Sequence, residues 1–438
     1  MTPRRDWLRT AGAATVFKFV QGGSPLKAAQ VNSQIGFGFI GSGIRGSQLL
    51  GEFMKIPGIR PLAVCDVYDG CLARAREQAG ASLDVTRDYE KILARKDIDA
   101  VVIATPDHLH KKMTLDALSA GKHVYIEKPM TWRIEEGPPI IAAEKSSGKI
   151  LQVGSGAKTS ALTAKMRELV KAGALGKVNM VRCFDHRNNA QGAWVYPVPP
   201  DASARTIDWP KFLGAAPKRP FDPKVFFRWR CWWEYSGGVA TDLFVHMLSQ
   251  LHEVMDVKAP KSAVSQGGIY RWKDGRSVPD VMSTVFEYDP EFLVDMYVNL
   301  DNAYASRGMI VMGTEATMVQ SGFNSLTLIE EPKAPDVQSY GTLAWPKAMR
   351  ASYFEQHGWT ADGRPKSPLP RPAKPKEVTV ERGPSHYEYF VLSLRNGAPS
   401  KENAEEGHFA AGAAHLANMA YKAGRRMSWD HASGKVTG

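Results

Sequence analysis

Short apolar runs alternate with helix-like segments over the first third of the chain. These runs lie at 34–40, 60–65, 100–104 and 123–126. Continuous apolar runs of this length are typical of strands buried on both faces of a parallel sheet. Helical patterns lie between them, at 47–54, 70–79 and 89–93. The alternation predicts an α/β domain built on a doubly wound parallel sheet.

The pattern changes in the second part of the chain. A helix-like segment at 158–173 places Leu162, Met166 and Leu169 on one face. Runs of β-branched and aromatic residues then follow, with Gly, Asn and Asp turns between them, which suits an antiparallel sheet. These runs lie at 178–184, 281–288, 293–300 and 308–312. We therefore predict two domains, at 34–155 and 156–438, behind an N-terminal extension of residues 1–33.

A glycine-rich turn joins the first predicted strand to the first helix. It reads Gly41-Ser42-Gly43-Ile44-Arg45-Gly46. Gly41 permits a tight turn, Gly43 lets the backbone approach a pyrophosphate, and Gly46 lets the helix pack closely on the strand. The helix N-terminus offers unpaired N–H groups to the anion. This loop predicts a Rossmann dinucleotide-binding domain in which all six residues contact the cofactor.

An acidic residue ends the second predicted strand. Asp66 lies twenty residues beyond Gly46, the separation at which a carboxylate accepts hydrogen bonds from the adenosine ribose. The carboxylate would repel a 2′-phosphate, so the pattern favours NAD over NADP. Arg45 keeps NADP open as the less favoured cofactor.

Polar residues follow the third and fourth apolar runs, where a doubly wound sheet forms its ligand crevice. The first set is Thr105-Pro106-Asp107-His108-Leu109-His110, from which Thr105, Pro106, His108 and His110 are expected beside the cofactor. For the two histidines, capping of the next helix is the alternative. The second set is Glu127-Lys128-Pro129, from which Glu127 and Lys128 are also expected beside the cofactor. Pro129 holds Lys128 extended, so its ammonium is expected to bind a substrate hydroxyl and stabilise the developing alkoxide; a surface lysine in a turn is the alternative.

The segment at 226–235 is the densest aromatic stretch, with three tryptophans, two arginines and a glutamate. Sugars present flat C–H faces to rings and hydroxyls to charged groups, so this mixture predicts a carbohydrate pocket, and a core strand or domain interface is the alternative. The candidates for substrate contact are Arg230, Trp232, Tyr235 and, from the end of another predicted strand, His186.

Asp242 and His246 are four residues apart in a predicted helix at 241–255, so both lie on one face. The carboxylate is expected to orient the imidazole, and His246 to act as general acid or base with Lys128. His246 and His252 are on opposite helix faces and no third ligand is evident, so we predict no metal site.

These motifs, in this order, resemble the Gfo/Idh/MocA family, named for glucose-fructose oxidoreductase, inositol dehydrogenase and rhizopine catabolism. The resemblance rests on the glycine loop, Asp66, the segments 105–110 and 127–129, and Gly237-Gly238 through His246. It implies a C-terminal α/β domain with a large open antiparallel sheet and a sugar, cyclitol or derivative as substrate. It also implies that Lys128, Asp242 and His246 form the catalytic group and that the chain forms a homo-oligomer, a dimer or tetramer.

Two enzyme functions suit this combination. The first is an NAD(P)-dependent oxidoreductase that takes a hydride from a CH–OH carbon of a sugar, cyclitol or derivative. The alternative is a glycosidase, epimerase or lyase that oxidises the sugar transiently and recycles a tightly bound NAD. A saccharide-binding module without catalysis is a third class, and the intact loop with Lys128 and His246 argues against it.

The first residues resemble a twin-arginine export signal, because Pro3-Arg4-Arg5-Asp6-Trp7-Leu8-Arg9 precedes a weakly apolar stretch. This predicts a periplasmic or exported protein. A disordered basic tail on a cytoplasmic protein is the alternative. The proline-rich segment 365–375 predicts a surface loop.

Charge and composition narrow the list of partners. The net charge is +11, of which residues 1–30 supply +4 through five basic residues and one acid. The remaining +7 is spread without a basic and aromatic cluster, so we predict no nucleic-acid partner. Acids or bases interrupt every apolar stretch before it could span a membrane. Four cysteines without CxxC spacing indicate core residues rather than zinc ligands or disulfides.

Overall fold

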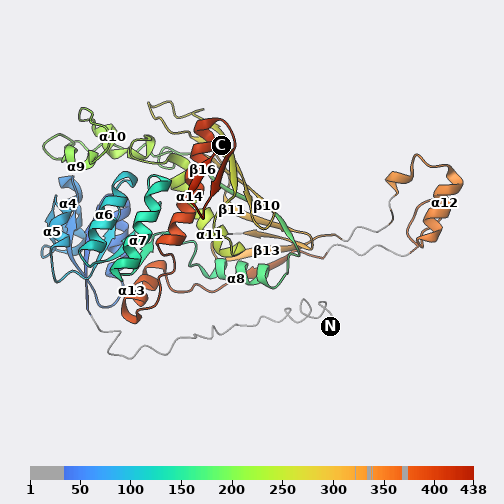
Figure 1. Ribbon diagram of the computed structural model, residues 1–438, viewed down its shortest axis with the longest axis horizontal. Helices are drawn as coiled ribbons and strands as arrows, with labels where there is room; N and C mark the ends of the chain where they lie inside the picture. The colour runs from blue at the N-terminus through green and yellow to red at the C-terminus, as the bar shows by residue number, and fades with distance from the viewer. Residues whose placement is uncertain (1–33, 321, 333–336, 338, 367–372) are drawn as a thin grey trace.

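The computed structural model describes residues 34–320, 322–332, 337, 339–366 and 373–438. The predicted export signal lies outside these residues. Two sheets stand side by side, each covered by helices (Figure 1). The α/β prediction is confirmed.

The first sheet is parallel and has six strands in the order β3-β2-β1-β4-β5-β6. The strands are β1 (Ile35–Ile40), β2 (Ile59–Cys65), β3 (Asp84–Thr86), β4 (Ala100–Ile103), β5 (His123–Ile126) and β6 (Leu151–Val153). The connecting helices are α3 (Ile44–Met54), α4 (Asp69–Ala79), α5 (Tyr89–Leu93), α6 (Asp107–Ser119), the turn η1 (Ile134–Glu136) and α7 (Gly137–Ser147). The strand order reverses between β1 and β4, which places the ligand crevice at their carboxyl ends.

The second sheet has ten strands in the order β14-β13-β12-β11-β7-β10-β9-β8-β15-β16. They are β7 (Val178–Arg187), β8 (Ser262–Gly268), β9 (Val281–Tyr288), β10 (Phe292–Asn299), β11 (Asn302–Gly313), β12 (Ala316–Gln320), β13 (Ser325–Glu330), β14 (Lys376–Thr379), β15 (Met427–Asp430) and β16 (Lys435–Thr437). Neighbouring strands are antiparallel except β7 and β10, which run parallel. The sheet is therefore mixed, because the long segment between β7 and β10 crosses over and returns in the same direction.

One face of the second sheet is covered and the other is open. The helices α8 (Ala161–Lys171), α11 (Val245–Met255) and α14 (Ala404–Ala423) pack together with this sheet around the largest apolar core. Outward-facing Val264, Val285 and Leu293, which alternate with buried neighbours, are exposed. One face of the sheet is therefore buried under helices, and the other carries exposed apolar side chains.

Two segments of the second half pack over the first sheet. The helices α9 (Trp209–Leu213) and α10 (Pro223–Phe227) and the turn η2 (Trp229–Cys231) form a small core with Val67. The helix α13 (His386–Asn396) buries Phe390 against Phe37 and Phe53 of the first domain, with a Phe37–Phe390 ring distance of 6.2 Å. Both segments therefore bring residues of the second half to the crevice of the first.

A long arm separates the paired strands β13 and β14. It carries the turn η4 (Tyr340–Thr342) and α12 (Lys347–Gln356), which lies well away from the two sheets (Figure 1). Much of the predicted proline-rich loop, at 367–372, lies outside the described residues. All four cysteines are free; Cys65, Cys183 and Cys231 are buried and Cys71 is half-buried, in accord with the core prediction.

Candidate active site

The glycine loop has the backbone that its sequence predicts. Gly41 adopts a φ of 87°, and a Cβ there would lie 2.7 Å from the carbonyl oxygen of Ala104. A Cβ at Gly46 would collide with the carbonyl oxygen of Gly41. Gly43 precedes α3 without a side-chain cap, and a Cβ there would meet open space. The first N–H groups of α3 are thus left for an anion, which fits a pyrophosphate.

A pocket of about 1830 Å³ begins at this loop and reaches the second sheet. It is large enough for a dinucleotide and a sugar together. Asp66 lines it at the end of β2, where its carboxylate accepts hydrogen bonds from the backbone N–H groups of Ser42 (2.7 Å) and Tyr68 (3.0 Å). The Asp66 carboxylate is therefore held beside the glycine loop, a position that suits the expected ribose contact.

Replacing Asp66 with alanine is expected to weaken NAD binding about tenfold and to strengthen NADP binding, because charged hydrogen bonds to the ribose are lost with the repulsion of a 2′-phosphate. Titration calorimetry with both dinucleotides measures this change. Asp69→Ala is the matched control, since Asp69 lies exposed on the neighbouring helix α4 and pairs with Arg87. An unchanged ratio of NAD to NADP affinity would count against the ribose role.

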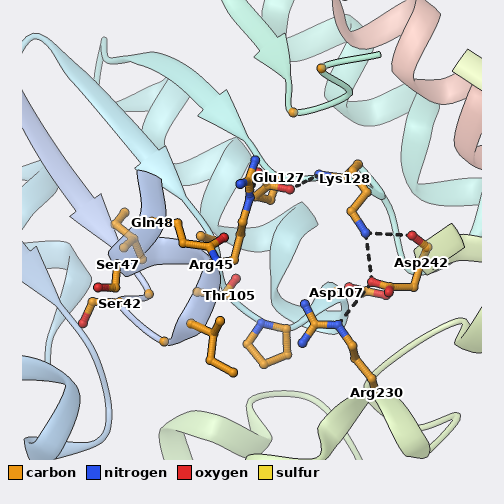
Figure 2. Close-up of a pocket in the computed structure, with 18 of the residues that line it drawn as sticks. Ser42, Arg45, Ser47, Gln48, Thr105, Asp107, Glu127, Lys128, Arg230 and Asp242 are labelled. Carbon is orange, nitrogen blue, oxygen red and sulfur yellow. Dashed lines mark hydrogen bonds and ion pairs between the residues drawn. The ribbon is translucent and has the colours of Figure 1, made fainter. Parts of the chain in front are cut away.

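Arg45 does not point toward the ribose end of the pocket. Its Nε lies 2.7 Å from Oε1 of the buried Glu127, and its Nη2 donates to the hydroxyl of Tyr387 on α13 (3.2 Å) (Figure 2). This network ties the glycine loop to β5 and α13. Glu127 and Arg45 both line the pocket as predicted, but their mutual ion pair removes the main support for a 2′-phosphate on Arg45.

Lys128 meets Asp242 and Arg230 across the two domains (Figure 2). Its Nζ lies 2.9 Å from Oδ1 of Asp242 and 2.9 Å from the Asp242 carbonyl oxygen, and Arg230 Nε lies 3.2 Å from the same Oδ1. The Lys128 and Asp242 side chains are only 10% and 11% exposed. Burial alone would raise the pKa of Asp242, but the two cations outweigh it and hold that pKa well below its usual range.

His246 lines the same pocket from the first turn of α11, just after the π-helical turn η3 (Ala240–Phe244) that carries Asp242. The prediction that the Asp242 carboxylate orients the His246 ring is wrong: within the described residues this carboxylate bonds to Lys128 and Arg230 instead. Two cations from other elements are stronger partners for it than a neutral ring. Burial, together with the nearby Lys128 charge, lowers the pKa of His246 well below its usual value. The imidazole is therefore uncharged at neutral pH.

Asp107 belongs to the motif at 105–110, but the sequence alone predicted no role for it in the site. It is buried at the start of α6, lines the pocket, and accepts a hydrogen bond from the N–H of Gly237 (3.4 Å). Burial, with the negative charge of Asp242, raises its pKa to about 7. Its place in a polar motif at a strand end was the available signal.

The raised pKa of Asp107 should make the free energy of unfolding depend on pH. The unfolded carboxyl ionises near 3.8, whereas the folded one keeps its proton to about pH 7. The folded state binds more protons in this interval, so its free energy of unfolding falls by about 1.4 kcal/mol per pH unit as the pH rises. The melting temperature of Asp107→Asn, compared with the parent, should therefore rise from about pH 4.5 to 7 and level off above.

Differential scanning calorimetry measures this effect. Asp84→Asn, at an exposed position on the same sheet, is the control. A difference between Asp107→Asn and the parent that is constant from about pH 4.5 to 8 would contradict the buried, protonated carboxyl.

The predicted cofactor contacts of His108 and His110 are wrong. Thr105 and Pro106 line the pocket, but the two rings turn away from it. His108 Nε2 lies 2.8 Å from the carbonyl oxygen of Phe212, and His110 Nδ1 lies 2.7 Å from that of Pro129. Both rings are therefore engaged with backbone carbonyl groups instead of facing the pocket.

His186, Trp232 and Tyr235 are also wrong as pocket residues. His186 stacks on Phe184 (5.3 Å) on the open face of the second sheet, because alternate side chains of β7 face opposite ways. Tyr235 is buried against Phe212 (5.0 Å), and Trp232 packs on two apolar cores. Arg230 alone of the four lines the pocket, whose other walls include Trp194, Tyr196, Phe226, Phe227 and Trp229.

Both halves of the chain are similar to domains of known proteins. Residues 35–155 match the model of an oxidoreductase family with an NAD-binding Rossmann fold, and residues 212–319 match that of the Gfo/Idh/MocA C-terminal domain. The chain belongs to the Gfo/Idh/MocA family. Its first domain is an NAD-binding Rossmann domain, and the arm and α13 lie beyond the matched regions.

Several family relatives are similar over part of their length. Inositol 2-dehydrogenase of Rhodococcus erythropolis is 36% identical over 163 residues, which cover 36% of this chain and 46% of that protein. A glycosyl hydrolase family 109 protein of Shewanella baltica is 31% identical over 160 residues, covering 30% and 35%. The chain thus spans about half or less of the length of these curated relatives. Levoglucosan dehydrogenase in complex with NADH and levoglucosan shares the fold, with a TM-score of 0.64, 16% identity and coverage of 90% and 99%.

No group of three or more His, Cys, Asp or Glu residues with metal-binding geometry occurs among the described residues. In the same part of the chain, no helix has both the length and the apolar character needed to span a membrane.

Proposed function

We propose that this protein is an NAD-dependent oxidoreductase that takes a hydride from a CH–OH carbon of a sugar, cyclitol or sugar derivative. The observation that carries the proposal is the meeting of Lys128 and His246 in the pocket that begins at the glycine loop and Asp66. The names of the inositol and levoglucosan dehydrogenases support the substrate class.

Lys128 and His246 act on different atoms of the substrate hydroxyl, Lys128 on the oxygen and His246 on the proton. A bound NAD, held at the glycine loop and Asp66, would supply the acceptor for the hydride of the carbinol carbon. The Lys128 ammonium, held by Asp242, donates a hydrogen bond to the alcohol oxygen and stabilises the negative charge that develops there. The neutral His246 ring accepts the hydroxyl proton on a nitrogen. Aromatic walls, among them Trp229, pack on the C–H faces of the sugar and exclude water.

A second function has its own support. Asp107 is a carboxyl that keeps its proton near neutral pH and lines the pocket. Such a group suits protonation of a leaving group, as a glycosidase or lyase with a tightly bound, recycled NAD requires. One relative is named a glycosyl hydrolase family 109 protein.

Denaturing release of nicotinamide from protein purified without added cofactor separates these functions. Stoichiometric, dialysis-resistant NAD would favour the recycled cofactor and glycoside cleavage or epimerisation. An empty protein that binds added NAD and forms NADH with sugars or cyclitols would favour the dehydrogenase. A protein that neither contains nor binds NAD would overturn both.

We also propose that the chain is exported by the twin-arginine route. Arg4 and Arg5 precede Trp7-Leu8 and a weakly apolar stretch. The full chain expressed in a bacterium is expected in the periplasm, and an Arg4→Lys, Arg5→Lys double variant in the cytoplasm. Equal retention of both in the cytoplasm would contradict export.

We propose further that the chain forms a homo-oligomer. The open face of the second sheet exposes apolar side chains, and the arm exposes Tyr340 (87%), Leu343 (59%) and Met349 (58%). Exposed apolar groups so concentrated mark protein contacts. Light scattering should give the mass of a dimer or tetramer, and Leu343→Asp with Met349→Asp should lower it. A monomeric full chain would contradict the proposal.

A further inference from the structure

The substrate end of the pocket carries more positive than negative charge. Lys128, Arg187, Arg230 and Arg307 line it, and the carboxylates that pair with them are Asp185 and Asp242. The third carboxyl there, Asp107, is largely protonated below its pKa of about 7. Four cations thus face two ionised carboxylates, and an excess of positive charge lining a pocket attracts an anion.

Arg187 and Arg307 share a single acid. They stand on adjacent strands, β7 and β11, where Arg307 pairs in register with Asp185. Arg187 Nε lies 3.0 Å from Oδ1 of Asp185, and Arg307 Nε lies 2.7 Å from Oδ2. The carboxylate is 4% exposed, whereas the two arginines are 29% and 34% exposed. Asp185 therefore fixes two guanidinium groups but neutralises only one.

Each of these arginines keeps donors for a ligand. A guanidinium has five N–H donors in a planar fork. Among the described residues, the Arg187 and Arg307 bonds to Asp185 use Nε and Nη2, and the Arg230 bond to Asp242 uses Nε. The Nη1 groups of all three, and Nη2 of Arg230, have no protein acceptor there. Carboxylate and phosphate oxygens match this fork better than sugar hydroxyls.

This cluster lies beside the reacting groups. Arg187, Arg307 and His246 line the same pocket, and the charges of both arginines help to lower the pKa of His246. Arg187 and Arg307 stand on strands β7 and β11 of the second sheet, whereas the glycine loop and Asp66 follow strands β1 and β2 of the first sheet. The cationic donors are therefore available to the substrate rather than to the adenosine end of the cofactor.

Resting on the proposed oxidoreductase function, we propose that the substrate is an acidic sugar or cyclitol derivative. Its anionic group, a carboxylate or a phosphate ester, binds between Arg187, Arg307 and Arg230. The hydroxyl that is oxidised then lies at Lys128 and His246. A neutral sugar would leave this excess of positive charge without an anionic partner in the pocket.

Binding of matched sugars to the NAD-loaded full chain tests this inference. Titration calorimetry compares glucuronate, galacturonate and glucose 6-phosphate with glucose and galactose. At least one acidic sugar is expected to bind about tenfold or more tightly than its uncharged counterpart, because charge-assisted hydrogen bonds to arginine are strong. Its affinity should fall with added salt. Preference for a uronate or for the phosphate identifies the anionic group.

Arginine variants test where the anionic group of the substrate binds. Arg187→Gln and Arg307→Gln are each expected to weaken binding of the acidic sugar about tenfold, and Arg307→Lys to weaken it less. Arg182→Gln is the matched control, because Arg182 lies on the same strand β7 but faces the open side with Asp295. Melting temperatures show that each variant is folded.

The outcomes separate this inference from the proposed reaction. If no acidic sugar binds more tightly than its neutral counterpart, or if both glutamine variants bind as the parent does, the anion site is overturned. NADH formation, recorded with the same sugars, reports on the reaction itself. Arginine-dependent binding without NADH formation would refute the oxidation alone, and NADH formation from neutral sugars only would refute the anion site alone.

Discussion

Replacing Lys128 with methionine is expected to lower kcat about 10³-fold and to leave the affinity for NAD nearly unchanged. The ammonium is the charged donor placed at the substrate oxygen, and loss of one such donor typically costs about 10²–10³ in rate. Methionine has a similar length, so the pocket keeps its shape. Steady-state NADH formation gives kcat, and titration calorimetry gives the NAD affinity.

Lys145→Met serves as the control for this substitution, because Lys145 lies exposed on α7 of the same domain. It is expected to change neither quantity. A Lys128→Met enzyme that retains full kcat would remove Lys128 from the reaction. Loss of NAD affinity equal to the loss of kcat would show instead that the lysine serves the cofactor.

His246→Asn is expected to lower kcat by about 10²–10³ and to alter the pH profile, since general-base catalysis contributes about 10²–10⁴ in rate. Because burial holds the pKa of His246 well below 6.5, the neutral ring persists at neutral pH and below. The parent kcat/KM should therefore fall only in distinctly acidic solution, as the ring gains a proton. The asparagine variant should lack this acidic limb.

His252→Asn is the matched control on the same helix, where His252 Nε2 lies 2.9 Å from the Tyr288 hydroxyl inside the core. That variant is expected to lose thermal stability and to keep the shape of the pH profile. An acidic limb that survives in His246→Asn would assign the titration to another group and contradict the role of His246 as the base.

The cofactor half was predictable because its signals are local. The turn at Gly41, the close contact at Gly46 and the carboxylate of Asp66 each follow from a strand, a loop and a helix that are adjacent in sequence. At Gly41 and Gly46, backbone sterics permit little besides glycine. The strands β5 and β9 begin and end where their apolar runs do.

The errors arise where a side chain's direction depends on distant partners. His186 missed the pocket by one residue, since Asp185 and Arg187 on either side face the covered side of the sheet. His108 and His110 bond to carbonyl groups of Phe212 and Pro129. A strand's alternation is visible in sequence, but which set faces the pocket is decided by what packs on each face.

The sequence by itself determined the α/β class, the dinucleotide loop and the family, since these depend on periodicity and on motifs of a few adjacent residues. Only the tertiary structure decided that Asp242 serves Lys128 and Arg230, that Asp107 is a buried acid, and that Arg187 and Arg307 share Asp185. Charges act through space and burial, and the groups that interact in this site lie up to 342 residues apart in the chain.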